Sequence, residues 1–263
     1  MNPRMRSSSA VTAVIAAAGS GERLGAGGPK AFVPVAGRPM VEWSVDAFRA
    51  CDSVRSIVVA APPGHIGDLA GHDLGVVPGG STRAESVANA LAAVGTAYVA
   101  IHDAARPLLT PELVEALVAD LDANEDAAGT IAAAPVTDTI KRAASRGSFR
   151  TVSDRKEPGD EDPSDGSATR GSLRTSGDRK EPLVVEGTED RSRLWRAQTP
   201  QVFRAEALRE ALAAAARPDE ATDEAMLVEA NGGTVLIHPV IEQNLKVTTS
   251  LDLRVAELLL AER

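Results

Sequence analysis

The sequence predicts an α/β fold in which a mostly parallel β-sheet is flanked by helices. Short apolar runs typical of buried strands alternate along the chain with segments of helical periodicity, which is the pattern of βαβ units. Hydrophobic residues make up 43% of the chain but aromatic residues only 3%, so we expect a core of Ala, Val, Leu and Ile. A length of 263 residues suffices for one main domain, which we expect to span residues 10–263.

The first predicted strand leads directly into a glycine-rich loop. The apolar segment 11–18 is followed by GSGERLGAGGPK, which ends at Lys30. Glycines allow positive φ and let backbone N–H groups approach an anion, while Arg23 and Lys30 supply positive charge. This segment therefore predicts a phosphate-binding loop for a nucleotide.

Two common phosphate loops do not fit the spacing of this segment. The Walker pattern ends in Gly-Lys followed by Ser or Thr, whereas Lys30 lies between Pro29 and Ala31. The dinucleotide fingerprint places its third glycine three residues after the second, a position that Leu24 occupies. From this segment alone, a flexible turn with two solvated cations stays open as the alternative.

The elements after the loop continue the alternation. We expect a helix at 40–50 and a buried strand at 56–61 that ends at two prolines. A short strand at 76–77 then leads into a Gly-Gly-Ser-Thr turn at 79–82 and a helix at 84–94. This second turn either meets a ligand with its amide groups or is an ordinary capped helix start.

Polar residues follow the strand predicted at 98–101, at the edge of a parallel sheet where ligands bind. Asp103 and Arg106 are therefore candidates for function, or else they form an ion pair with each other. The next predicted elements are a helix at 111–124 capped by Thr110, a strand at 129–135 and an extended segment at 136–142. We expect ordered chain again from Leu194, with helices at 205–216 and 224–231 and a strand at 234–239. A short strand at 243–247 carries Lys246, and Ser250 caps a last helix at 251–262.

Residues 143–190 differ in composition, because polar and charged residues dominate there. GSFRTVSDRKEP, which starts at Gly147, recurs as GSLRTSGDRKEP from Gly171, so the segment contains a local duplication. We expect this low-complexity duplicated insertion to be a mobile, solvated excursion without catalytic residues. We also expect a disordered N-terminus at residues 1–9.

Charge and composition exclude several classes of protein. A formal net charge of −9 argues against general binding to nucleic acid or to anionic membranes. The single cysteine, Cys51, is typical of a core thiol in a reducing compartment, so we expect a cytoplasmic protein. The histidines have no metal-ligand spacing and form no convincing dyad with a carboxylate. We interpret all four as structural: His65, His72, His102 and His238.

Seven motifs occur in the order AAAGSGERLGAGGPK, GGSTRAESV, HDAARP, APVTDTIKR, QTPQVF, ATDEA and NLKVT. Together they closely resemble the 2-C-methyl-D-erythritol 4-phosphate cytidylyltransferase family of the non-mevalonate isoprenoid pathway. The resemblance covers the chain from residue 11 to residue 262 apart from the duplicated insertion. It implies a Rossmann-like nucleotidyltransferase fold with a projecting arm that contains the insertion. It also implies an enzyme that joins CMP from CTP to the sugar phosphate and releases diphosphate, with Mg²⁺ held mainly by the CTP phosphates.

The resemblance also implies roles for individual residues. Arg23 and Lys30 fall on the cations that stabilise the transition state, and Arg191 and Lys246 on those that hold the attacking phosphate. Family members are homodimers, so Arg191 is expected to serve the site of the other subunit. Further residues that line the sugar-phosphate site are Asp103, Arg106, Thr139, Thr199 and Thr222. The nucleotide-binding residues are Ala17, Ala18, Gly19, Gly80, Ser81, Ser86 and Ala104, and no protein metal ligand is expected.

The expected chemistry follows from charge. Both reactants are phosphates, so fixed cations must bring two anions together and stabilise the charge that develops during transfer. Because the nucleophile is already ionised, no general base is required. Two alternatives stay open: a ribitol 5-phosphate cytidylyltransferase, and a catalytically inactive nucleotide-binding module.

Overall fold

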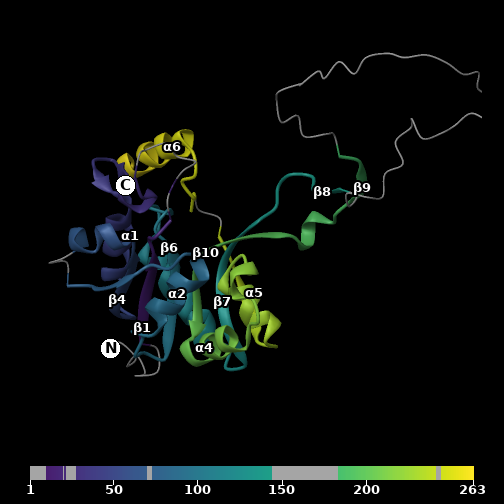
Figure 1. Ribbon diagram of the computed structural model, residues 1–263. Helices are drawn as coiled ribbons and strands as arrows, with labels where there is room; N and C mark the ends of the chain where they lie inside the picture. The colour runs from purple at the N-terminus through teal and green to yellow at the C-terminus, as the bar shows by residue number, and fades with distance from the viewer. Residues whose placement is uncertain (1–9, 20, 22–27, 70–72, 144–182, 241–243) are drawn as a thin grey trace, which may run out of the picture. The chain divides into compact units, whose positions relative to one another are not determined.

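A β-sheet forms the centre of this computed structural model, which describes residues 10–19, 21, 28–69, 73–143, 183–240 and 244–263 (Figure 1). Its strands are β1 (Val11–Ala16), β4 (Val54–Ala61), β5 (Gly75–Pro78), β6 (Tyr98–Asp103), β7 (Ala127–Pro135), β10 (Trp195–Arg204) and β11 (Thr234–Pro239). Their order in the sheet is β11-β7-β10-β6-β1-β4-β5. Of these described strands, only β10 runs antiparallel to its neighbours. The predicted mostly parallel sheet is therefore confirmed.

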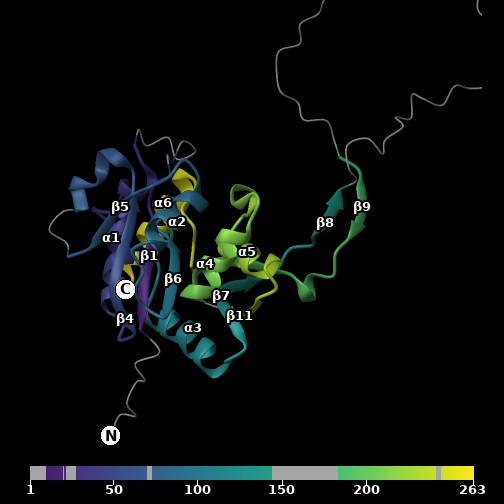
Figure 2. The same cartoon turned by 60° about the horizontal axis from the view of Figure 1, so that its bottom comes forward.

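Helices cover both faces of the sheet (Figure 2). They are α1 (Met40–Arg49), α2 (Arg83–Leu91), α3 (Pro111–Ala123), α4 (Ala205–Ala214), α5 (Glu224–Ala230) and α6 (Ser250–Ala261). Ala13 and Ile15 of β1 belong to the core cluster shared with α1 and α3. Val14, between them, belongs to the cluster shared with α2, α4 and α5. Successive strand residues thus point to opposite faces, and both faces are buried by small aliphatic side chains.

A smaller cluster packs α6 beside a short hairpin near the start of the chain. The strands β2 (Pro34–Val35) and β3 (Arg38–Pro39) pair around a tight turn in which Ala36 and Gly37 both have positive φ. Val35 and Met40 pack there against Leu260 of α6. This contact fixes the C-terminal helix close to the segment that carries Lys246. None of the described helices has the length and apolar character needed to cross a bilayer.

The chain divides into two compact units: the sheet unit (Met1–Pro135 with Trp195–Arg263) and the arm unit (Val136–Leu194). Within the arm unit, β8 (Lys141–Ala143) pairs antiparallel with β9 (Val185–Thr188), and a short 3-10 helix, η7 (Arg191–Arg193), follows. Regular structure therefore resumes before Leu194, inside the segment expected to be an excursion. Composition missed β9 because its order comes from pairing with a distant strand. Both copies of the duplicated sequence and residues 1–9 lie outside the described residues.

Two local predictions near the C-terminus are wrong. The segment 244–248 contains no strand, because the backbone bond from Val247 N–H to the Ala105 carbonyl is not continued as a ladder. The cap of α6 is Thr249 rather than Ser250: its hydroxyl accepts from the Asp252 N–H while the Asp252 carboxylate accepts from the Thr249 N–H. This reciprocal capping box selects the cap one residue earlier.

Candidate active site

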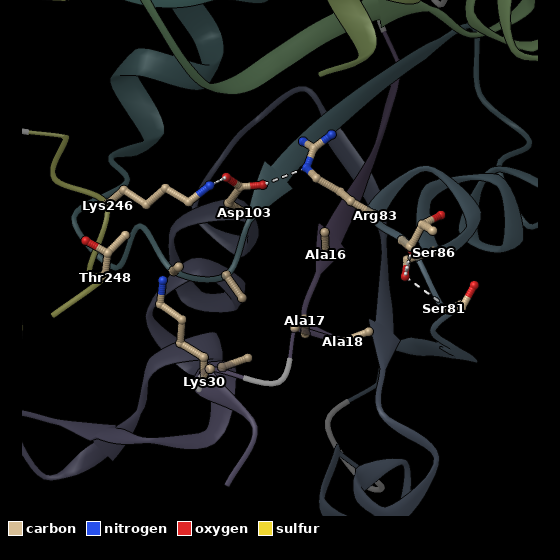
Figure 3. A pocket seen from close by; sticks show the side chains of 17 residues that line it. Ala16, Ala17, Ala18, Lys30, Ser81, Arg83, Ser86, Asp103, Lys246 and Thr248 are labelled. Carbon is tan, nitrogen blue, oxygen red and sulfur yellow. Dashed lines mark hydrogen bonds and ion pairs between the residues drawn. The ribbon is translucent and has the colours of Figure 1, made fainter. Parts of the chain in front are cut away.

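A cavity of about 680 Å³ opens at the carboxyl ends of β1 and β6 and beside the start of α2 (Figure 3). Its volume is that of a small-molecule site, and it lies at the edge where parallel sheets bind ligands. It is lined by Ala16, Ala17, Ala18, Gly19, Gly21, Lys30, Ala31, Gly80, Ser81, Thr82, Arg83, Ser86, Asp103, Ala104, Ala105, Lys246 and Thr248.

The chain that follows β1 forms the first wall. The Lys30 N–H donates to the Gly19 carbonyl over 3.2 Å and so closes the base of the loop. Gly21 has a φ of +73°, and a Cβ there would lie 2.8 Å from the Cβ of Lys30, so glycine is required for this close return of the chain. The predicted loop cation Lys30 is thereby brought to the cavity. The other, Arg23, lies outside the described residues.

The first turn of α2 forms the second wall. Thr82 caps the helix by accepting from the Glu85 N–H over 3.1 Å, and the Ser86 hydroxyl accepts from the Gly80 N–H over 3.0 Å. The N–H and hydroxyl of Ser81 both donate to the Glu85 carboxylate over 2.7 Å, and these bonds lower the pKa of Glu85. The turn is thus a capped helix start that also lines the cavity. Nucleotide binding by it stays a prediction.

Asp103, the last residue of β6, is ion-paired on both oxygens (Figure 3). The Lys246 Nζ lies 2.6 Å from its Oδ2, and the Arg83 Nε lies 3.1 Å from its Oδ1. Burial by itself would raise the pKa of Asp103, but the two cations outweigh it and hold the pKa well below its usual range. The alternative ion pair with Arg106 does not form among the described residues, because the carboxylate is occupied by other cations.

Arg83 joins Asp103 to a second acid. Its Nη1 lies 2.5 Å from the Oε1 of Glu224, the first residue of α5. Burial raises the pKa of Glu224, and Arg83 opposes that shift. Burial also acts to lower the pKa of Arg83, but the two acids beside it raise that pKa on balance. Three ion pairs therefore link four side chains of alternating charge in the order Glu224, Arg83, Asp103 and Lys246.

Lys246 reaches the cavity from the irregular segment 244–248. Val247 anchors this segment to the Ala105 carbonyl over 2.8 Å. The Thr248 hydroxyl donates to the Asp252 carboxylate over 2.6 Å, and Thr248 is the main cause of the lowering of the Asp252 pKa to about 2. With both sides of the segment held, the Lys246 side chain remains 43% exposed at the cavity.

Arg106 and Thr199 lie behind the cavity wall rather than in it. The Arg106 Nη1 donates to the Asn244 carbonyl over 2.6 Å, and the Asn244 Nδ2 donates to the Thr199 carbonyl over 2.8 Å. The Thr199 hydroxyl in turn accepts from the Asp103 N–H over 3.0 Å. Burial lowers the pKa of Arg106. These two residues tie the end of β6 to the segment 244–248, and contact with a ligand stays a prediction for both.

Three other predicted positioning residues are not among the residues that line the cavity. Thr222 is exposed and precedes Asp223, the cap of α5. Thr139 and Arg191 are exposed residues of the arm unit, where the Arg191 guanidinium donates to the Thr137 carbonyl. Their roles in binding a sugar phosphate stay predictions.

The cavity also contains residues that sequence reasoning missed. Arg83 follows the helix cap in the motif GGSTR, and Thr248 ends the motif NLKVT, so both stood inside patterns already noticed. Glu224 stands in the motif ATDEA and does not line the cavity, and only the fold brings it to Arg83. The lining residues that sequence reasoning did predict are Ala17, Ala18, Gly19, Lys30, Gly80, Ser81, Ser86, Asp103, Ala104 and Lys246.

In the part of the chain that the structure describes, no group of three or more His, Cys, Asp or Glu side chains could hold a metal ion. Two His–carboxylate pairs do form, contrary to the sequence-based expectation. His65 lies 2.6 Å from Asp68, and His238 lies 2.7 Å from Asp120. Neither pair lines the cavity. The second pair joins β11 to α3, which spacing along the sequence does not reveal.

Known proteins resemble this chain over nearly its whole length. The family model IspD, 2-C-methyl-D-erythritol 4-phosphate cytidylyltransferase, matches residues 11–158 and 172–262. A cytidylyltransferase of that name from Saccharopolyspora erythraea is 38% identical over 262 residues, covering 95% of this chain and 99% of the relative. A bifunctional IspD/IspF enzyme from Anaeromyxobacter is 40% identical over 246 residues, and the match covers 90% of this chain but only 54% of that longer relative.

A solved structure supports the same assignment. The crystal structure of 2-C-methyl-D-erythritol 4-phosphate cytidylyltransferase from Thermus thermophilus aligns with a TM-score of 0.67 at 31% identity, covering 95% of this chain and 98% of that chain. The mostly parallel sheet, the glycine loop after β1 and the seven motifs agree with this similarity. The chain belongs to the 2-C-methyl-D-erythritol 4-phosphate cytidylyltransferase family.

Proposed function

We propose that the protein transfers CMP from CTP to 2-C-methyl-D-erythritol 4-phosphate, giving 4-diphosphocytidyl-2-C-methyl-D-erythritol and diphosphate. The observation that carries this proposal is the cavity at the carboxyl ends of β1 and β6, which is lined by both Lys30 and Lys246 (Figure 3). Two lysines on the wall of one cavity, at the carboxyl edge of a mostly parallel sheet, are suited to binding phosphate groups. The names of the similar proteins favour methylerythritol phosphate over ribitol 5-phosphate as the acceptor.

In the proposed reaction, a phosphate oxygen of the sugar phosphate attacks the α-phosphorus of CTP. A new O–P bond forms while the bond to diphosphate breaks, so the leaving group takes up negative charge. Lys30 and Arg23 stabilise that charge, and Lys246 and Arg191 hold the attacking phosphate in line. The nucleophile is ionised beforehand, so the reaction proceeds without a general base.

The remaining predicted residues bind the two substrates. We assign the nucleotide to Ala17, Ala18, Gly19, Gly80, Ser81, Ser86 and Ala104. We assign the sugar phosphate to the neighbourhood of Asp103, Arg106, Thr139, Thr199 and Thr222. The ionised carboxylate of Asp103 suits the hydroxyl groups of a polyol, because it can accept hydrogen bonds while it holds Lys246.

We include Mg²⁺ as the cofactor. The acid among the lining residues, Asp103, is already bound to two cations, so the protein's donor set fits a metal ion held mainly by the triphosphate oxygens. When bound, the ion neutralises phosphate charge. We further propose a cytoplasmic homodimer in which Arg191 of each subunit serves the cavity of the other.

The decisive experiment measures diphosphate release by the purified protein from CTP with Mg²⁺. We expect release with methylerythritol phosphate and none when the acceptor is omitted. Release with ribitol 5-phosphate alone would assign the protein to the alternative acceptor. No release with either acceptor would leave a nucleotide-binding module without catalysis.

A further inference from the structure

We propose that Glu224 is a positioning residue that acts through Arg83 to keep Lys246 directed into the cavity. Glu224 does not line the cavity itself, whereas Arg83 and Lys246 do. The inference rests on the proposed function, because Lys246 is the residue assigned there to the attacking phosphate. It adds a residue of α5 to a site built from β1, β6, α2 and the segment 244–248.

The environment of Glu224 is unfavourable for a residue that serves stability alone. The residue is 2% exposed, its Oε1 is bound to Arg83, and its Oε2 has no hydrogen-bond partner among the described residues. A buried carboxylate with one oxygen unpaired is costly, and replacing a whole buried ion pair by apolar side chains is often neutral or stabilising. Its side-chain partner, Arg83, therefore indicates the task of Glu224, which is to hold the Arg83 guanidinium.

The orientation of Arg83 decides which partner Lys246 has. Glu224 binds the Nη1 of Arg83, so the guanidinium presents its Nε to the Oδ1 of Asp103 and leaves Oδ2 to Lys246. An arginine without that restraint favours a two-pronged pairing with both oxygens of a carboxylate. In that arrangement Arg83 would compete with Lys246 for Oδ2. Glu224 prevents the competition and keeps the ammonium group in place. Figure 3 shows the result, with Asp103 between Lys246 and Arg83.

The start of α5 is itself fixed to the sheet, which makes Glu224 a firm support. Asp223 caps the helix by accepting from the Met226 N–H over 3.0 Å. The other oxygen of Asp223 accepts from the Gln201 Nε2 over 2.9 Å, and Gln201 is a buried residue of β10. The sheet thus holds the first turn of α5 in place through Asp223, and with it the side chain of Glu224 beside Arg83.

The first test compares Glu224→Gln with the wild-type chain in steady-state kinetics. We expect kcat/KM for methylerythritol phosphate to fall about tenfold while KM for CTP changes by less than about twofold, because orientation of the attacking phosphate is lost. The matched control is Glu206→Gln, which removes an exposed acid paired with Arg209 on α4, and we expect unchanged kinetics for it. Thermal unfolding of both variants reports whether the fold is intact.

The second test needs no turnover, so it separates this inference from the proposed function. An amine-acylating reagent is applied without substrates, and modification of Lys246 is followed by mass spectrometry with Lys141 as the internal reference. We expect the Lys246 rate to rise by about threefold or more in Glu224→Gln, because the ammonium group loses its ion pair. If this happens although the wild-type chain releases no diphosphate, the positioning role stands and the proposed function fails.

Three results would overturn the inference. The first is unchanged kinetics together with an unchanged Lys246 labelling rate. The second is an equal loss of kcat/KM for both substrates accompanied by a lower Tm, which would assign Glu224 to stability. The third is failure of Glu224→Gln to fold at all, which has the same meaning.

Discussion

A single charged side chain at the cavity depends on the conformation of one glycine. The close return of the chain at Gly21 places Lys30, which is partly buried and lines the cavity. If it stabilises charge in the transition state, its loss should affect turnover far more than folding.

We predict that Lys30→Ala lowers turnover by about 10²- to 10³-fold, the range seen when one group that stabilises transition-state charge is removed. Diphosphate release at saturating substrates measures this, and thermal unfolding should show an intact fold. Lys141→Ala, a lysine of β8 in the arm unit, is the matched control and should keep its turnover. Near-wild-type turnover of Lys30→Ala would remove this lysine from the mechanism.

His102 gives a prediction about pH. It is fully buried on β6, and burial lowers its pKa from 6.5 to about 4. The unfolded chain binds a proton at this position more readily than the folded chain, so the stability contribution is complete above pH 6.5 and is lost as the pH falls toward 4. The full effect is on the order of 3 kcal/mol.

The ring protons of His102 in an NMR titration test this directly, with His102→Gln used for assignment. We expect no protonation of His102 until the pH is well below 6, whereas a midpoint near 6.5 would contradict the prediction. Glu224, whose pKa burial raises, acts on stability in the opposite sense, so the titration of His102 itself is the cleaner measurement.

At this scale the sequence predicted the cations better than their partners. Lys30 and Lys246 stood in recognisable motifs, and both line the cavity. Arg106 and Thr199 do not line this cavity but tie the end of β6 to the segment 244–248, and their contact with the sugar phosphate stays a prediction. The contact between Arg83 and Glu224 was beyond sequence reasoning, since it joins helices from different parts of the chain.

Among the elements, β10 packs an aromatic ring against a glycine of β7. Gly129 pairs with Phe203, and a Cβ at Gly129 would lie 2.3 Å from the Phe203 Cδ1. The aromatic ring is fully buried, so it has little room to move.

We predict that Gly129→Ala destabilises the fold by about 1–3 kcal/mol, the usual cost of overpacking a core. The free energy of unfolding in urea measures this effect. The control is Gly95→Ala, because nothing lies within 4 Å of a Cβ at that exposed glycine, and it should be neutral or slightly stabilising. Equal free energies of unfolding for the two variants would show that the sheet shifts enough to accommodate a methyl group at Gly129.

Alternating apolar runs were sufficient to predict most strands and helices, but three features needed the assembled fold. The reversal of β10 is invisible to alternation, because an antiparallel strand has the same local pattern as a parallel one. The segment 244–248 resembles a strand in composition but has no neighbour to form a ladder with. The strand β9 could not be predicted from its own residues, because it forms by pairing with β8.

For the whole molecule, the outstanding proposal is a homodimer in which Arg191 crosses to the other subunit. We predict that a mixture of Lys30→Ala and Arg191→Ala proteins, unfolded and refolded together, recovers activity that neither variant has alone. In a mixed dimer, one of the two sites would combine an intact Lys30 with an intact Arg191 from the other chain. Diphosphate release measures the recovery, and sedimentation confirms the dimer. No recovery in a verified mixed dimer would place Arg191 at its own subunit's site.

The pairing of Pro135 with Trp195 has a consequence for how such a gene can change in length. Pro135 and Trp195 hold the two ends of the intervening segment at the sheet. Residues inserted between them therefore change the register of no strand pair in the seven-stranded sheet. The entropic cost of closing a loop between two fixed ends grows only with the logarithm of the number of residues in the loop. A tandem duplication there, such as the one that this chain carries, leaves the seven-stranded sheet unchanged and adds sequence that can mutate without affecting the sheet.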